Sequence, residues 1–215
     1  GVNDGLVSNF SLVMGFAGGT TAAGKPEFIL LAGLSGLIAG AFSMAAGEYI
    51  SMRSQRDVYE HQIDVEKAEL EEWPEEEQKE LVLIYRAKGL SEDEAEVVAS
   101  RIMNRPDVAL DTMVKEELGL DPQQLGSPWG AALSSFSAFS VGALVPIIPF
   151  FFNVGIGAIL SSAILAAVAL IVVGGTLTAS SGKSPLWGSC RMLLAGSLAA
   201  AVTYGVGFAI GTAVS

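Results

Sequence analysis

Pairs of glutamates at helical spacing are the first residues in this sequence that could do chemistry. Glu66 and Glu69 are three residues apart, so their carboxylates share one face of a helix. Glu77 and Glu80 repeat that spacing a short distance along the chain. If two neighbouring antiparallel helices carry these pairs, four carboxylates come together, and a bound cation relieves their mutual repulsion.

A later helix could add further ligands to this cluster. Met113 and Glu117 are four residues apart, with Glu116 beside them. Carboxylates suit hard divalent cations, and a thioether is a softer ligand that favours ferrous iron over calcium. The alternative is a solvated acidic helix face without metal, because this spacing is common on helices. Spacing alone leaves both interpretations open.

A second group of candidates lies in apolar surroundings. Asp4 comes early in a mostly uncharged stretch, and an ionisable side chain at membrane depth indicates a functional site. Met44 and Glu48 are four residues apart in the next such stretch, so they share a helix face. Together the three could form a pathway that trades protons for a cation. The alternatives are an interfacial helix cap for Asp4 and an interfacial helix end for Glu48.

The distribution of charge indicates which elements position these residues. Of the 23 acidic residues, 20 lie between Arg53 and Asp121, together with nine of the 12 basic residues. The remainder of the chain has almost no charge, so its expected solvent is lipid. The acidic segment attracts cations and repels nucleic acid, which excludes a nucleic-acid partner. Cys190 and His61 are the single residues of their types, so no disulfide framework or multi-histidine site is possible.

Uncharged runs predict five membrane-spanning helices. A span needs about 20 mostly apolar residues, so the longest run has room for two spans. The break within it is expected at Pro146–Asn153, because proline removes a backbone donor. Glycines in these runs favour close helix packing and are compatible with a homodimer. The runs are residues 5–24, 28–47, 122–182 and 192–215, and the glycines are Gly33, Gly36, Gly40, Gly207 and Gly211.

The acidic segment is expected to form a helical domain between the second and third spans. No residue that breaks a helix interrupts the second span before Glu72. Pro74 and Pro106 each favour a helix start, and Ser91 begins a capping box for the helix between them. Apolar residues that share helix faces predict the core of this domain. They are Leu81, Ile84, Tyr85, Val97, Val98 and Ile102.

The sequence therefore predicts an all-α, polytopic membrane protein. Its expected parts are residues 1–52 with spans 1 and 2, residues 53–121, and residues 122–215 with spans 3 to 5. Basic residues near the membrane place residues 53–121 in the cytosol by the positive-inside rule. The first residue is glycine and no targeting segment is visible, so we expect a shortened N-terminus and a prokaryotic cell membrane, with a vacuolar membrane for a eukaryotic chain. The basic residues are Arg53, Arg56, Lys183 and Arg191 on one side, against Lys25 on the other.

Four short segments, taken in their order and spacing, resemble the vacuolar iron transporter family across essentially the whole chain. The resemblance implies a homodimer that moves ferrous iron, and sometimes Mn²⁺, out of the cytosol in exchange for protons. It implies no prosthetic group; the partners are the metal ions, protons and the bilayer. The segments are Asp4-Gly5-Leu6, Ser43-Met44-Ala45-Ala46-Gly47-Glu48-Tyr49, Ser54-Gln55-Arg56-Asp57 and Lys115-Glu116-Glu117-Leu118-Gly119.

The resemblance also implies roles for individual residues. Asp4 and Met44 match the positions that bind the ion in the membrane, and Glu48 matches a carboxylate at the cytosolic mouth. One family ligand position appears here as Val114, which reduces the ligand set, and Glu116 is the neighbouring carboxylate that could compensate. The positions matching the cytosolic metal ligands are Glu66, Glu69, Glu77, Glu80, Met113 and Glu117.

Two other classes of protein compete with a transporter. The first is a membrane-anchored iron buffer or sensor, which the polar Asp4 within a span disfavours. The second is an enzyme such as a ferroxidase. Carboxylate di-iron oxidases add histidines in a Glu-x-x-His pattern. His61 follows Glu60 directly and no second histidine exists, so no enzyme is expected.

Overall fold

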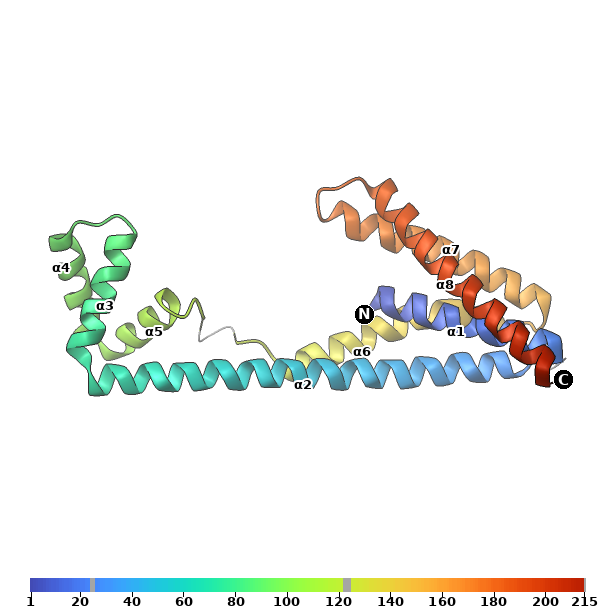
Figure 1. Cartoon of the computed structure of the whole chain (residues 1–215), viewed down its shortest axis with the longest axis horizontal. Coiled ribbons are helices and arrows are strands. Elements are labelled where there is room, and N and C mark those ends of the chain that lie inside the picture. The colour runs from blue at the N-terminus through green and yellow to red at the C-terminus, as the bar shows by residue number, and fades with distance from the viewer. Residues whose placement is uncertain (24–25, 122–124, 215) are drawn as a thin grey trace. The chain divides into compact units, whose positions relative to one another are not determined.

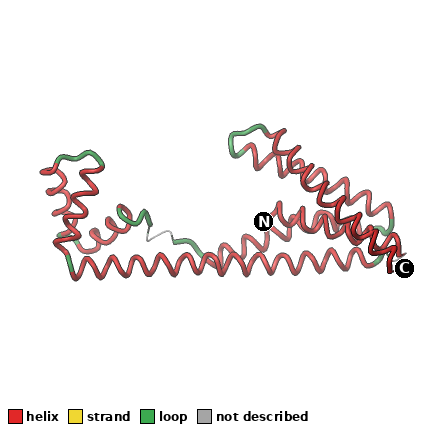
Figure 2. Tube along the Cα trace, in the orientation of Figure 1, coloured by secondary structure: helices red, strands yellow, loops and turns green. Residues whose placement is uncertain are grey.

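The computed structural model describes residues 1–23, 26–121 and 125–214, and within these ranges every regular element is a helix (Figure 2). The all-α prediction is therefore confirmed. Two residues used in the sequence analysis lie outside the described residues. They are Lys25, which entered the orientation argument, and Pro122, which begins the third uncharged run. The elements are α1 (Val2–Ala23), α2 (Phe28–Glu72), α3 (Pro74–Ala87), α4 (Glu92–Met103), α5 (Pro106–Glu116), α6 (Pro128–Leu144), the 3₁₀ helix η1 (Val145–Phe151), α7 (Ile156–Ala179) and α8 (Pro185–Val214) (Figure 1).

The chain divides into two compact units, which we call the apolar unit and the acidic unit. The apolar unit consists of residues 1–48 and 131–215, and the acidic unit consists of residues 49–130. Helix α2 contributes its residues through Glu48 to the first and the remainder to the second. The predicted continuation of the second span as a helix to Glu72 is confirmed.

Helices of the apolar unit have the length and composition of membrane spans. Within the described residues four candidates meet both conditions: α2, α6 together with η1, α7 and α8. Large apolar side chains such as Phe42, Leu133, Ile164 and Leu198 are exposed on them, as lipid-facing residues should be. Helix α1 has 22 residues but does not reach the same hydropathy, so the fifth span stays a prediction.

Glycines bring α1 and α8 into close contact. A side chain at Gly18 would collide with the backbone carbonyl of Tyr204, and one at Gly207 would collide with that of Gly15. Small residues allow helices to approach in this way where lipid supplies no hydrophobic driving force. The Gly207–Gly211 pair therefore packs within the chain, against α1. Helix α1 buries Leu6, Phe10, Val13 and Ala17 in the main apolar core.

The predicted break in the long uncharged run is confirmed. Helix α6 ends at Leu144, η1 carries the chain through the two prolines, and α7 begins at Ile156. Pro146 has its carbonyl satisfied by the hydroxyl of Ser162, which donates to it at 2.6 Å. This bond replaces the helical partner that the proline-rich segment cannot provide.

The helices of the acidic unit begin where the sequence predicted. Pro74 and Pro106 occupy the first turns of α3 and α5, and Ser91 and Glu94 form the capping box of α4. Leu81, Ala99 and Met113 are fully buried in its core. The core prediction was wrong for Val97, which is 52% exposed. Ala95 and Ala99, one helical turn apart, face the core instead, and Val97 lies between them on the opposite face.

Candidate metal centre and membrane cavity

Three glutamates from three different helical segments converge in the acidic unit. Glu66 lies on α2, Glu77 lies in the first turn of α3, and Glu117 immediately follows α5. One carboxylate oxygen of each lies within 4.8 Å of those of the other two. We call these residues the carboxylate triad. Of the four glutamates in the two predicted pairs, the structure brings Glu66 and Glu77 together.

Two members of the carboxylate triad are buried and incompletely bonded. Glu66 is only 2% exposed and Glu77 only 7%. Within the described residues, Oε1 of Glu66 and Oε2 of Glu77 have no hydrogen-bond partner. A buried carboxylate without partners is unfavourable unless it is protonated or neutralised by a cation. Each of these two carboxylates therefore needs either a proton or a nearby cation to balance its charge.

Burial and like charge raise the pKa of Glu66 to about 8. The main cause is loss of solvation on burial, followed by the negative charge of Glu117 and a hydrogen bond between the two carboxyl groups. The charges of Glu77 and Glu69 act in the same direction. In the metal-free protein Glu66 therefore holds its proton at neutral pH.

The other two members also have raised pKa values. Burial raises the pKa of Glu77 first, and the charges of Glu80 and Glu117 add to it. The side chain of Glu117 is exposed, but partial loss of solvation and the charge of Glu80 still raise its pKa, although the hydrogen bond from Glu66 opposes the increase. A divalent cation favours the ionised form of all three groups, so it competes directly with these protons.

The remaining predicted ligands differ in their burial and in their contacts. Glu69 is half-buried and Glu80 is exposed, and both act on the triad through their charge. Glu116 forms an ion pair with Lys88, next to the end of α3. Met113 is fully buried in the core, and its carbonyl accepts the backbone N–H of Glu117 at 2.8 Å.

Val114, which stands where the resemblance implies a metal ligand, is also fully buried. Its apolar side chain fills space on α5 directly beside Met113. This position therefore supplies packing to the acidic unit and no oxygen to the metal centre.

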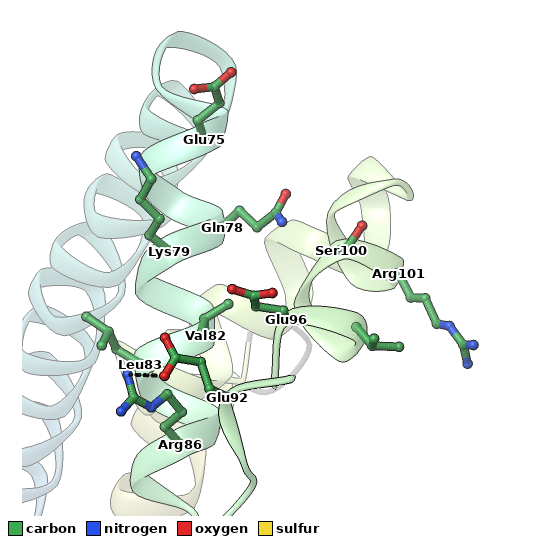
Figure 3. Close-up of a pocket in the computed structure, with 11 residues that line it drawn as sticks. Glu75, Gln78, Lys79, Val82, Leu83, Arg86, Glu92, Glu96, Ser100 and Arg101 are labelled. Atoms are coloured by element: carbon green, nitrogen blue, oxygen red, sulfur yellow. Dashed lines mark ion pairs between the residues drawn. The ribbon is translucent and has the colours of Figure 1, made fainter. Parts of the chain in front are cut away.

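A groove elsewhere in the acidic unit has a different charge pattern. It has a volume of about 890 Å³ and lies between α3 and α4, where acidic and basic side chains alternate (Figure 3). Arg86 and Glu92 form an ion pair across it at 3.8 Å. Because opposite charges already balance there, it lacks the surplus of carboxylates that distinguishes the triad.

The apolar unit contains a cavity of about 380 Å³ between α1, α2 and α6. Asp4 and Met44 both line it, so the structure brings these two predicted residues to one site. Asp4 is exposed in the first turn of α1, while Met44 is half-buried against Phe139. Glu48 is exposed and does not line this cavity.

The same cavity contains a residue that the sequence argument did not select. Asn9 is 2% exposed, and its Nδ2 donates to the Ala143 carbonyl of α6 at 2.7 Å. A polar amide five residues after Asp4, in an uncharged stretch that also contains Ser8 and Ser11, was the available signal. Without the structure, a buried amide could not be distinguished from one that faces water.

Comparison with known proteins identifies the family. The model of the VIT family matches residues 1–208. The chain belongs to the VIT family. A "Vacuolar iron transporter 1" of Oryza sativa subsp. japonica is 32% identical over 213 residues, covering 99% of this chain and 83% of the relative. A "Vacuolar iron transporter" of Acanthamoeba castellanii is 34% identical over 214 residues, covering 97% and 75%.

Membership of the VIT family confirms the resemblance seen in the sequence. It makes the chain a multi-pass membrane transporter and not an enzyme. A third relative, a "Vacuolar iron transporter" of Centaurea cyanus, is 30% identical over 207 residues, which are 96% of this chain and 83% of the relative. The similarity extends through both units, so it covers the triad and the cavity together.

Proposed function

We propose that this chain exports ferrous iron, and also Mn²⁺, from the cytosol in exchange for protons. Its relatives are named vacuolar iron transporters and match nearly the full chain. The observation that carries the proposal is the cavity at Asp4 and Met44, which unites a carboxylate and a thioether among apolar helices. A membrane anchor needs no polar cavity at that place, whereas a cation that crosses a bilayer does.

The acidic unit gathers the ion in this proposal. The oxygens of Glu66 and Glu77 that have no hydrogen-bond partner support this role, because a divalent cation supplies a positive charge to balance them. Glu116 joins the ligands when its ion pair with Lys88 opens. The proposed ligands are Glu66, Glu69, Glu77, Glu80, Met113, Glu116 and Glu117.

The apolar unit carries the ion across the membrane. Asp4 and Met44 bind it in transit, and Glu48 acts at the cytosolic mouth of the pathway. When a proton from the far side reaches Asp4, the ion is released, because a protonated carboxyl is a poor ligand. Proton entry and metal exit are therefore coupled at one side chain.

We infer a topology of five spans, with α1 as the first and the acidic unit in the cytosol. Arg53, Arg56, Lys183 and Arg191 support this orientation by the positive-inside rule. We further propose a homodimer in the cell membrane of a prokaryote. Chemical cross-linking in membranes and the accessibility of single introduced cysteines test the dimer and the topology separately.

Transport in proteoliposomes tests the proposed function. Vesicles with an acidic interior and the acidic unit outside should accumulate Fe²⁺, and internal pH should rise as protons leave. Asp4→Asn should abolish accumulation, because the neutral amide cannot exchange a proton. Glu96→Gln is the matched control, since it removes an exposed carboxylate on α4 that is distant in the sequence from every proposed ligand. Unchanged uptake in the Asp4 variant would refute the pathway.

A membrane-anchored iron buffer is the competing function, and the carboxylate triad alone would suffice for it. Measurements of metal uptake in the same vesicles distinguish a buffer from a transporter. A buffer binds a fixed amount of metal at the outer surface, and a chelator removes all of it. A transporter fills the interior beyond the number of protein molecules, and the accumulated metal resists an external chelator.

A further inference from the structure

The side-chain oxygen of Asn9 is a buried acceptor that no described residue satisfies. Asn9 lies on α1 and is 2% exposed. Its Nδ2 donates to the carbonyl of Ala143 at 2.7 Å, and this bond fixes which end of the amide is the nitrogen. Oδ1 has no hydrogen-bond partner among the described residues. A buried acceptor left without a partner costs free energy. We therefore expect a bound ligand, or a water molecule bound to that ligand, to contact this oxygen.

The unpartnered oxygen lies against α2 in the wall of the cavity. A β-carbon placed on Gly36 would lie only 2.8 Å from Oδ1 and would also collide with Leu12. Gly36 and Asn9 both line the cavity that contains Asp4 and Met44. Glycine at this position therefore lets α2 approach the buried amide oxygen closely, and any larger side chain would displace that oxygen.

We propose that Asn9 Oδ1 is a neutral oxygen ligand for the cation in transit and sets its preference for harder ions. This inference rests on the proposed transport function. Met44 offers a soft thioether and Asp4 a charged oxygen, while carbonyl-type oxygens suit Mn²⁺ better than softer metals. The amide gains no proton in the physiological range, so its own contribution to binding the ion does not change with pH.

The hydrogen bond from Asn9 Nδ2 to the Ala143 carbonyl makes Asn9 suitable as a ligand. Loss of a hydrogen bond that orients a metal ligand typically lowers metal affinity on the order of 10- to 100-fold. We expect an effect of about this size if the bond between Asn9 and Ala143 is lost. Because Nδ2 is held by a backbone carbonyl of α6, Oδ1 cannot rotate away from the cavity. An amide with this geometry lowers the cost of binding, since its orientation is already fixed.

Competition between Mn²⁺ and Co²⁺ for transport in proteoliposomes tests this role. Asn9→Leu keeps the volume and removes the oxygen, and should raise the KM for Mn²⁺ about tenfold while that for Co²⁺ changes less than about threefold. Met44→Leu should shift the ratio in the opposite direction. A merely structural asparagine would affect both metals by the same factor, and that result would overturn the proposal.

A second variant keeps the test decisive if Asn9→Leu does not fold. Gly36→Ala places a carbon 2.8 Å from Oδ1 and so displaces this oxygen while Asn9 itself is kept, so it should reproduce the loss of Mn²⁺ preference. Gly47→Ala is its matched control on α2, because nothing lies within 4 Å of the added carbon. If Gly36→Ala leaves the ratio unchanged, the ligand role is refuted. If the wild-type protein moves neither metal, the proposed function itself fails, which is a distinct result.

Discussion

Metal binding at the carboxylate triad should release protons, with Glu66 as the main source. Burial and the neighbouring Glu117 raise the pKa of Glu66 to about 8. A group with that pKa is about 90% protonated at pH 7 and about 10% protonated at pH 9. Because a divalent cation binds the ionised carboxylate, it must displace the proton. We expect Glu66 to release about 0.9 proton per bound ion at pH 7 and about 0.1 at pH 9.

The affinity for metal should follow the same titration. Below pH 8, each unit of acidification should weaken the apparent affinity about tenfold through Glu66, and the dependence should flatten above pH 8. Glu77 and Glu117 also have raised pKa values, so they steepen the dependence on the acidic side. Isothermal titration of the full-length protein in detergent with Mn²⁺, repeated in buffers of different ionisation enthalpy, gives both affinity and proton release.

The raised pKa also changes the stability of the metal-free protein with pH. In the unfolded chain Glu66 loses its proton near pH 4.5, whereas the folded protein keeps it until about pH 8. Between these values the folded state binds more protons, so the free energy of unfolding decreases as pH rises. Mn²⁺ replaces the missing proton, so its stabilising effect on thermal unfolding should increase from pH 6 to pH 8.

Two variants isolate the contribution of Glu66. Glu66→Gln removes the titrating group, so proton release at pH 7 should fall by about 0.9 and the affinity should depend less on pH. Glu96→Gln removes an exposed carboxylate of α4 and should leave both quantities unchanged. The reasoning fails if the wild-type protein releases no protons at pH 7 and its affinity stays constant from pH 6 to 9.

Three further perturbations test packing, capping and the ligand set. Gly18→Ala should destabilise the α1–α8 contact by about 1–3 kcal/mol, whereas Gly205→Ala, with nothing within 4 Å, should not lower the thermal unfolding temperature. Ser91→Ala removes the capping box and should cost about 1 kcal/mol, seen as faster hydrogen exchange at the start of α4. Lys88→Gln frees Glu116 and should strengthen Mn²⁺ binding up to about fivefold; unchanged affinity would exclude Glu116 as a ligand.

Helix boundaries in the acidic unit were predictable because local chemistry decides them. Pro74 and Pro106 fix a backbone angle suited to a first helical turn, and Ser91 satisfies the free N–H group of Glu94. Gly89 has a φ of +102°, which lets the chain leave α3. None of these effects depends on a distant contact, so the sequence alone contains them.

The membership of the carboxylate triad was only partly predictable from the sequence. Spacing identifies which glutamates share a helix face, but it does not say which faces meet. In the structure Glu66, Glu77 and Glu117 converge, Glu80 stays exposed, and Glu116 pairs with Lys88. These differences arise from tertiary packing on the core around Met113, which no local pattern specifies.

The two sites differ in the kind of donor they offer, and this difference suits the proposed sequence of events. The triad offers carboxylates, whereas the membrane cavity offers one carboxylate, Asp4, with the neutral groups of Asn9 and Met44. A divalent ion is held more strongly by several negative oxygens than by one. A gathering site must capture the ion at low concentration, but a transit site must also let it leave. Because only Asp4 carries charge among these three cavity groups, a single protonation there removes most of the electrostatic hold on the ion.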